Sequence, residues 1–337
     1  MTGAPLRGAL DGTTGDPMAN ENSARPTKTE RRQQAREQAR LAREREQKRE
    51  KRNKRLIQGS IVIGVLAVVA VIALVLTQTL KPAGPGPENM ASGGAVFGAD
   101  LEVQPSAALQ PDQTREYPEV NREELPLDIS LYVDYMCPGC GNFEQTYGTM
   151  LENYVGGGDA TLRVYPLNFL DNRSQGTNYS TRAANMFGCL VEEQPDVAFA
   201  VHNRLLSAEV QPQEGTAGLT DDELLEQAEL AGAEITPELE SCVSDKRFSS
   251  FISSNTKAVT EQGLLGLAEG AQIAAGNQLI PADQPQTLSQ TPTVIVNGEQ
   301  WVQSRDGDLE AYLLKVKSEV EQQQLKNSQP DGSSESE

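Results

Sequence analysis

Two cysteines stand two residues apart in the stretch Met136-Cys137-Pro138-Gly139-Cys140-Gly141. A Cys-x-x-Cys pair supports two different chemistries. The two thiolates can supply half of a structural zinc site, or the two thiols can close and reopen a disulfide. The residues around the pair, and the elements that position it, decide between these readings.

The zinc reading lacks ligands. A structural zinc ion takes four Cys or His ligands, usually from two closely spaced pairs. The other two cysteines, Cys189 and Cys242, are 53 residues apart. The single histidine, His202, lies in an amphipathic helix pattern, where a surface or half-buried histidine is the commoner explanation. We therefore expect no metal and no cofactor.

The position of the cysteine pair in the predicted secondary structure favours the dithiol interpretation. Residues 127–135 alternate apolar and polar side chains and predict a strand. Apolar residues recur at helical spacing from Phe143 to Val155, and three glycines follow. A cysteine at the start of a helix meets free N–H groups and the positive end of the helix dipole, which lower its pKa. Cys137 is thus the expected nucleophile, and Cys140, one turn further on, would resolve a mixed disulfide.

Further elements follow along the chain. Residues 160–167 predict a second strand, and 94–101 a short edge strand. Helices are expected within a block at about 178–265, where Thr220 and Thr236 are in N-cap positions. Residues 293–296, Asn297-Gly298 and 301–302 predict a hairpin, and 309–320 a last helix. This order predicts an α/β, thioredoxin-like fold with an inserted helical domain.

The motifs resemble the DsbA-like thiol:disulfide oxidoreductases, in particular the membrane-anchored members from Gram-positive actinobacteria. The resemblance rests on the stretch from Tyr132 to Glu144 around the cysteines, and on Gln290-Thr291-Pro292-Thr293, which resembles the family's cis-proline strand. It implies that Pro292 is a cis-proline and that Thr291 and Pro292 bind substrate. It also implies that Cys137 and Cys140 oxidise cysteines of exported proteins, and that a DsbB-like or VKOR-like membrane partner reoxidises them.

The sequence departs from the family pattern at three places. The dipeptide between the cysteines is Pro138-Gly139, whereas the best-known oxidants have Pro-His. Residue 131 is Leu where many relatives carry a buried acid, so we expect Asp134 or Glu144 to transfer protons instead. The connection 266–290 is longer than the family norm and could reshape the substrate groove.

An uncharged, largely apolar run at 56–80 separates two parts of opposite charge. Residues 1–55 hold 15 basic and 8 acidic side chains, and residues 81–337 hold 14 and 40. A run of this length can cross a bilayer, and the basic flank predicts a cytoplasmic N-terminus. We expect a basic tail (1–55), a transmembrane signal-anchor (56–80), an extracytoplasmic linker (81–126), the catalytic domain (127–320) and a disordered acidic tail (321–337).

Outside the cytoplasm, Cys189 and Cys242 are expected to form a structural disulfide, although two buried free thiols would also fit. The basic tail has no aromatic residues to stack on bases, so no nucleic-acid binding is expected. Two alternative functions remain open. One is a thiol-disulfide reductase or isomerase, and the other is a non-catalytic binding or metal-chaperone module.

Overall fold

The computed structural model describes residues 84–118, 127–276 and 278–328, together with isolated helical positions between 36 and 49. The chain divides into two compact units, Met1–Lys81 and Pro82–Glu337. The predicted transmembrane segment 56–80 lies outside the described residues. Within the described part, no helix is long and apolar enough to cross a membrane.

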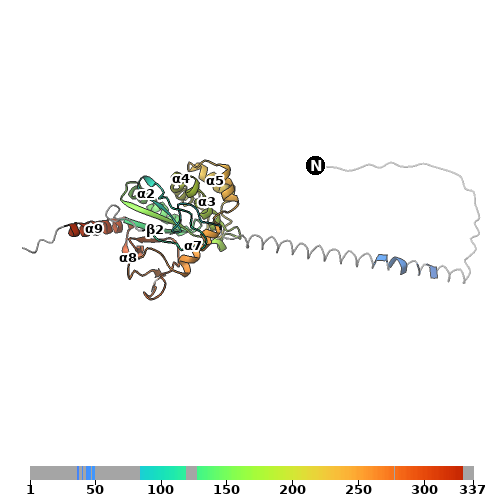
Figure 1. Ribbon diagram of the computed structural model, residues 1–337. Helices are drawn as coiled ribbons and strands as arrows, with labels where there is room; N and C mark the ends of the chain where they lie inside the picture. The colour runs from blue at the N-terminus through green and yellow to red at the C-terminus, as the bar shows by residue number, and fades with distance from the viewer. Residues whose placement is uncertain are drawn as a thin grey trace, which may run out of the picture. The chain divides into compact units, whose positions relative to one another are not determined.

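A five-stranded sheet forms the centre of the second unit (Figure 1). Its spatial order is β1-β3-β2-β6-β7, with β2 parallel to β3 and the other neighbours antiparallel. The strands are β1 (Ala95–Phe97), β2 (Leu127–Val133), β3 (Ala160–Pro166), β6 (Thr293–Val296) and β7 (Glu299–Trp301). The edge strand expected within 94–101 is therefore present as β1, on the outer side of β3.

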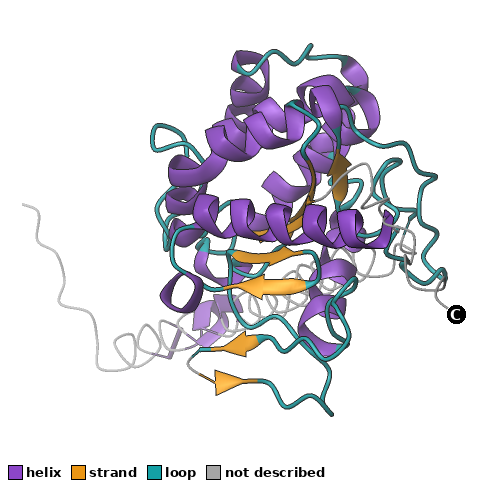
Figure 2. Cartoon of the chain, turned by 90° about the vertical axis from the view of Figure 1, so that its left-hand side faces the viewer, coloured by secondary structure: helices purple, strands orange, loops and turns teal. Residues whose placement is uncertain are grey.

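Helices flank this sheet (Figure 2). Helix α2 (Pro138–Gly156) connects the two parallel strands. The expected helical block follows β3 and contains α3 (Tyr179–Glu193), α4 (Pro195–Leu205), α5 (Asp221–Leu230), α6 (Pro237–Ser244) and α7 (Ser249–Glu261). Short helical turns occur at η1 (Ala99–Leu101), η2 (Asp171–Arg173) and α8 (Gln303–Asp306), and α9 (Leu309–Ser328) is the last helix described.

Sequence signals at the element ends are confirmed. Thr220 and Glu223 form a reciprocal capping box at the start of α5, and the Thr236 hydroxyl accepts the Leu239 N–H at the start of α6. Asn297 and Gly298 both have positive φ, 51° and 86°, as a two-residue hairpin turn requires.

The predicted end of the last helix was wrong. Helix α9 does not stop at Val320 but continues to Ser328, into the segment predicted as a disordered tail. Residues 321–326 are Glu, three Gln, Leu and Lys, all strong helix formers, so nothing in their intrinsic propensity ends the helix. Residues 329–337 lie outside the description.

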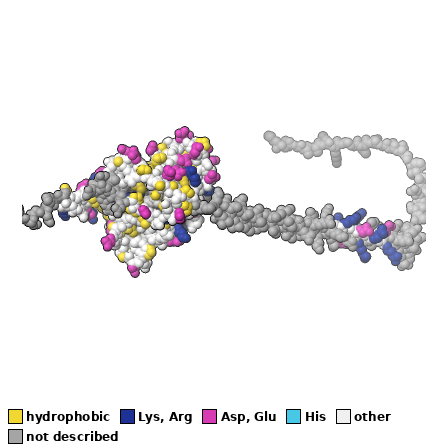
Figure 3. All heavy atoms as spheres, in the orientation of Figure 1, with side chains coloured by type: hydrophobic (Ala, Val, Ile, Leu, Met, Phe, Trp, Pro, Cys, Tyr) yellow, Lys and Arg dark blue, Asp and Glu magenta, His cyan; other side chains and the backbone are white. Residues whose placement is uncertain are grey.

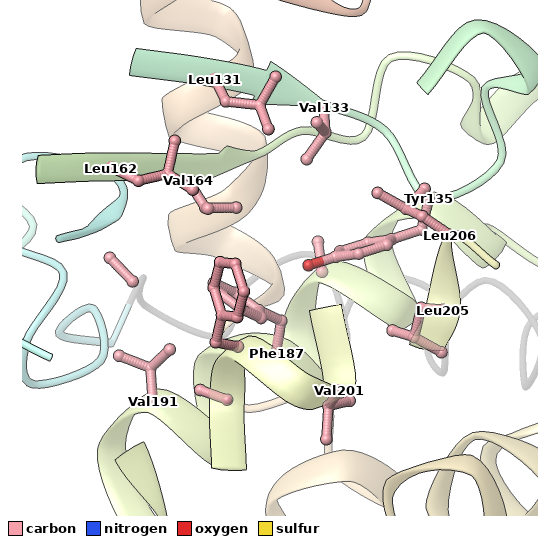
Figure 4. Packing of buried hydrophobic residues seen from close by; sticks show 14 of the residues in the cluster. Leu131, Val133, Tyr135, Leu162, Val164, Phe187, Val191, Val201, Leu205 and Leu206 are labelled. Carbon is pink, nitrogen blue, oxygen red and sulfur yellow. The ribbon is translucent and has the colours of Figure 1, made fainter. Parts of the chain in front are cut away.

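The main core lies on one face of the sheet. Leu131 and Val133 of β2 and Leu162 and Val164 of β3 point toward Phe187 of α3 (Figure 4). These side chains are almost fully buried. Their burial between strands and helices is the main apolar stabilisation of the unit, since each fully buried side chain of this size contributes about 1.5–3 kcal/mol.

The opposite face carries a second, smaller core. Tyr132, Tyr165 and Ile295, from β2, β3 and β6, pack there against the connection that follows α7. This connection, 266–290, contains a small hairpin of β4 (Ala274–Ala275) and β5 (Gln278–Leu279). Its Ile273 and Leu288 are buried in that core. The connection thus covers part of the reverse face of the sheet.

A buried ion pair joins this face to the linker. Asp128 accepts hydrogen bonds from Arg163 Nε at 3.0 Å, Thr161 Oγ1 at 2.8 Å and the Tyr117 hydroxyl at 2.6 Å. The Arg163 side chain is fully buried. Tyr117 belongs to the segment predicted as a linker, so part of that segment is packed on the domain.

The expected structural disulfide is present. Cys189 of α3 and Cys242 of α6 are bonded, with their Cα atoms 6.0 Å apart. Asn185 lies beside the bond and donates to the Cys242 carbonyl at 3.2 Å. The disulfide therefore fastens α6 to the central helix of the inserted block.

We predict that the Cys189→Ala/Cys242→Ala variant loses about 4 kcal/mol of unfolding free energy, because the bond closes a long loop in the unfolded chain. Urea unfolding of the two proteins, without reductant, measures the difference. A loss below about 1 kcal/mol would contradict the loop-closure account.

Candidate active site

The two cysteines of the motif lie at the junction of β2 and α2. Cys137 is the N-cap residue of α2, and Pro138 is at its first position. The Cys137 carbonyl accepts the N–H groups of Cys140 at 2.9 Å and Gly141 at 3.2 Å, which closes the first turn. Proline suits this position because its missing N–H would have no partner there. Pro138 and Gly139 are exposed.

The two cysteines differ in solvent exposure. Cys137 is 8% exposed and Cys140 is fully buried, and both are free thiols in this structure. Cys137 is therefore the residue that an incoming sulfur can reach, as expected. Since Cys189 and Cys242 are bonded to each other, they are not available to complete a four-cysteine zinc site. Among the described residues no group of three potential ligands could hold a metal ion.

Pro292 lies opposite the cysteines. The Thr291–Pro292 peptide bond is cis, as the resemblance implied. The Cys137 thiol donates to the Thr291 carbonyl at 3.2 Å. A Cβ built on Gly139 would lie 3.2 Å from Pro292 Cδ and 3.6 Å from Cys137 Sγ. The active-site loop thus packs directly on the proline turn, 154 residues further along the chain.

The surroundings of Cys137 favour its thiolate. Its pKa is lowered to about 6, chiefly because the Cys140 thiol donates a hydrogen bond to its sulfur. Burial opposes this shift, and the backbone N–H groups of Gly139 and Cys140 add to it. The contact with the Thr291 carbonyl belongs to the protonated form, because a carbonyl oxygen can only accept.

The pKa of Cys140 is shifted in the opposite direction. Burial raises the pKa of its thiol well above the ordinary value, and the neighbouring Cys137 adds to the shift. The backbone N–H of Asp134 points to the Cys140 sulfur at 3.4 Å. The pair therefore consists of one sulfur that is easily ionised and one that stays protonated until its partner has reacted.

Asp134 is buried beside this pair. Its carboxylate accepts hydrogen bonds from the Met136 N–H, the Leu170 N–H and the Ser180 hydroxyl, at 2.8, 2.8 and 2.7 Å. Burial nevertheless raises its pKa to about 7, and the Cys137 charge contributes to the rise. A carboxyl group with this pKa can both accept and return a proton near neutral pH.

Glu144, the other acid proposed from sequence, has a different setting. It lies one turn after Cys140 on α2 and is 7% exposed. Its Oε2 is 3.5 Å from Nε2 of His202, whose Nδ1 is 3.2 Å from the Tyr135 hydroxyl. The expectation that His202 is a surface or half-buried residue was wrong, because it is 1% exposed. Helix α4 packs its histidine face against α3 and Tyr135, which a helical pattern alone does not show.

Comparison with known proteins agrees with this geometry. Residues 122–266 match the family model described as Thioredoxin. This part of the chain, from β2 to the loop after α7, is similar to the Thioredoxin family. The dithiol at the start of α2, the cis-proline opposite it and the helices inserted between β3 and β6 are the features that the resemblance predicted.

The serine/threonine-protein kinase PknE of Mycobacterium tuberculosis is 34% identical to this chain over 119 residues. The match covers 35% of this chain and 21% of the kinase, so the chain spans about a fifth of the length of the curated relatives it matches. PknE of Mycobacterium bovis matches to the same extent.

Among solved structures, oxidised DsbA of Mycobacterium tuberculosis is 22% identical, with a TM-score of 0.47; the match covers 67% of this chain and 92% of that one. The reduced DsbG of the same organism is 21% identical, with a TM-score of 0.43, and the match covers 62% of this chain and 91% of that one. MdbA of Actinomyces oris, a thiol-disulfide oxidoreductase, is 16% identical, with a TM-score of 0.45, and the match covers 68% of this chain and 89% of that one.

The candidate active site contains one residue that sequence reasoning missed. Gln211, in the loop after α4, donates from Nε2 to the carbonyls of Cys137 at 2.8 Å and Tyr135 at 3.4 Å. A Cβ built on Gly141 would collide with its Oε1. Through these two hydrogen bonds, Gln211 fixes the backbone conformation around Cys137. No local signal in the sequence marks it, since it reaches the site only through the packing of the helical block.

We predict that alkylation of Cys137 by iodoacetamide in the reduced protein has a midpoint near pH 6. In the Cys140→Ala variant the midpoint should rise toward 9, because the main hydrogen-bond donor to the thiolate is lost. Mass spectrometry of the labelled peptide over a pH series measures both values. A wild-type midpoint above 8, or one unmoved by the substitution, would contradict the proposed cause.

We predict a second titration near pH 7 that belongs to Asp134. Its raised pKa means that ionisation costs stability, so this contribution to unfolding free energy falls as pH rises from about 4 to about 7. Ser180→Ala removes a donor to the carboxylate and should move the titration upward, whereas Asp134→Asn should abolish it. Carboxyl NMR across a pH series measures the titration. An Asp134 that titrates near 4 in all proteins would refute its assignment to proton transfer.

Proposed function

We propose that the protein is a thiol:disulfide oxidoreductase that forms disulfides in exported proteins on the outer side of the membrane. In the first step, a substrate thiolate attacks Sγ of Cys137 in the Cys137–Cys140 disulfide. The bond between the two cysteines breaks, a mixed disulfide forms on Cys137, and Cys140 leaves as a thiolate. A second substrate thiol then attacks the mixed disulfide and releases Cys137, so that two electrons pass from substrate to enzyme.

The observation that carries the proposal is the stabilised Cys137 thiolate opposite Pro292. A stabilised thiolate makes the reduced enzyme more favourable and its disulfide a stronger oxidant. It also makes Cys137 a good leaving group in the second step. The hydrogen bond from Cys140 supplies this stabilisation without the histidine that stronger oxidants carry between their cysteines.

Asp134 supports the proton transfer in this scheme. The departing Cys140 sulfur is buried and its pKa is high, so it requires a proton as soon as it leaves. The backbone N–H of Asp134 donates to the Cys140 sulfur, and the carboxyl group of the same residue has a pKa of about 7. We propose that this carboxyl group protonates Cys140 in this step and accepts the proton back on reoxidation.

The proposed location rests on the sequence. The apolar segment 56–80, with basic residues before it and an acidic part after it, favours a single-pass protein whose catalytic domain lies outside. Acidic side chains are spread over the visible face of the domain (Figure 3). The reduced dithiol must give its electrons to an oxidant, for which we propose a quinone-linked membrane partner, DsbB-like or VKOR-like.

We predict a reduction potential for Cys137 and Cys140 between about −120 and −180 mV, the range of strong oxidants and isomerases. Equilibration of the full chain in glutathione buffers, followed by trapping of free thiols, measures it. Offered a peptide that contains a disulfide, Cys140→Ser should accumulate a mixed disulfide, because the Cys137 thiolate attacks one peptide sulfur and the other leaves as a thiolate; Cys137→Ser should not accumulate one. A potential near −270 mV, like that of thioredoxin, would reject the oxidase and favour a reductase.

A further inference from the structure

The backbone carbonyl of Cys137 accepts three hydrogen bonds. Two come from the N–H groups of Cys140 and Gly141, at 2.9 and 3.2 Å, and the third comes from Gln211 Nε2 at 2.8 Å. The same Nε2 lies 3.4 Å from the Tyr135 carbonyl, so one side-chain amide joins two carbonyls of the turn between β2 and α2. This turn is therefore held from outside by Gln211.

The shape of the turn controls how well the Cys137 thiolate is stabilised. The Cys137 N–H closes the turn by donating to the Asp134 carbonyl at 3.0 Å. The backbone N–H groups of Gly139 and Cys140 help to lower the pKa of Cys137. Because a hydrogen bond weakens steeply as its angle closes, these N–H groups stabilise the thiolate only while Cys137 keeps its orientation at the helix start. A residue that holds the turn therefore acts on the acidity of Cys137.

Gln211 is held by two loops that are joined to each other. It lies in the α4–α5 loop (206–220), where its own N–H donates to the Ser207 carbonyl at 3.0 Å. The β3–α3 loop (167–178) binds this loop through three side chains, which donate at 2.8, 2.8 and 2.6 Å: Arg173 to Glu214, Gln175 to the Gly215 carbonyl and Thr177 to the Ala217 carbonyl.

The β3–α3 loop also reaches the other side of the site. Its Leu170 N–H donates to the Asp134 carboxylate at 2.8 Å. The two joined loops therefore fix the position of the Cys137 turn, through Gln211, and of the Asp134 carboxylate, through Leu170.

Gly141 leaves the space that Gln211 occupies. A Cβ built on Gly141 would collide with Gln211 Oε1 and would lie 2.7 Å from Gln211 Cδ. Gly141 is a buried residue of α2, and glycine within a helix is less favourable than alanine. An alanine here would favour the helix and displace the flexible end of the Gln211 side chain. Gly141→Ala therefore removes the Gln211 contact without weakening α2.

We propose that Gln211 is a positioning residue that sets the acidity of Cys137, and that Gly141 is the residue whose missing side chain admits it. Gln211 acts through the Cys137 carbonyl, not through the sulfur. The inference deepens the proposed function, on which it rests, because a more stable Cys137 thiolate makes the disulfide a stronger oxidant.

The first experiment measures the alkylation midpoint of Cys137 in the reduced full chain, with iodoacetamide over a pH series. Gln211→Ala should raise the midpoint from about 6 to about 7, because the turn loses its outer hydrogen bonds and the N–H groups lose their alignment. Gln211→Glu, whose carboxylate cannot donate, should raise it at least as far. Gln213→Ala removes an exposed glutamine from the same loop and should leave it unchanged.

Gly141→Ala separates positioning from stability. It should raise the midpoint as far as Gln211→Ala does, while the unfolding free energy in urea stays unchanged or increases. In the Gln211→Ala background it should add no further rise, since the contact that it removes is already lost. A merely structural role of Gln211 predicts the reverse, namely a lower unfolding free energy in Gln211→Ala and an unmoved midpoint.

The reduction potential gives an independent readout. A tenfold loss of thiolate stability corresponds to about 30 mV, so at pH 8 the potentials of Gln211→Ala and Gly141→Ala should be about 30 mV more negative than that of the unaltered protein. The potential of the unaltered protein tests the proposed function, and these differences test the role of Gln211, so either can fail alone. A midpoint unmoved by Gln211→Ala, an equal rise in Gln213→Ala, or rises that add in the double variant would overturn the proposal.

Discussion

The antiparallel pairing of β2 with β6 is the constraint on which the site depends. In this register Tyr132 lies opposite Thr293, so the end of β2, which leads to Cys137, meets the start of β6, which follows Pro292. A shift by one residue would turn every side chain of β6 to the other face of the sheet. The hydrogen bonds between Asp128 and Asn297, through the Asp128 N–H and carbonyl, fix the far end of the same pairing.

This placement explains why two cysteines separated by only two residues have pKa values shifted in opposite directions. Cys137 is the N-cap residue of α2, where backbone N–H groups and the Cys140 thiol stabilise the negative charge of its thiolate. Cys140 points into the core, where no water can solvate a thiolate. The same burial that suppresses ionisation of Cys140 raises the pKa of Asp134. One packing arrangement thus produces a nucleophile, a protected resolving sulfur and a proton donor matched to it.

The segments added to the thioredoxin sheet contribute to both faces. The helical block, fastened by the Cys189–Cys242 bond, supplies Ser180 to Asp134 and Gln211 to the Cys137 loop. The segment 84–118 and the connection 266–290 contribute to the reverse face, where Tyr117 contacts the Asp128–Arg163 pair and Ile273 and Leu288 pack against Tyr132, Tyr165 and Ile295.

The sequence by itself determined the local elements and the reacting atoms. Periodicity, caps and the Asn-Gly turn located the strands and helices, and the cysteine spacing with the Thr-Pro strand located the dithiol and Pro292, because these signals are read over a few neighbouring residues. Only tertiary structure decided that His202 is buried, that Gln211 reaches the site and that the backbone N–H of Asp134 donates to the Cys140 sulfur. These facts arise from which faces of distant segments pack together, and burial, which sets each pKa, is a property of that packing.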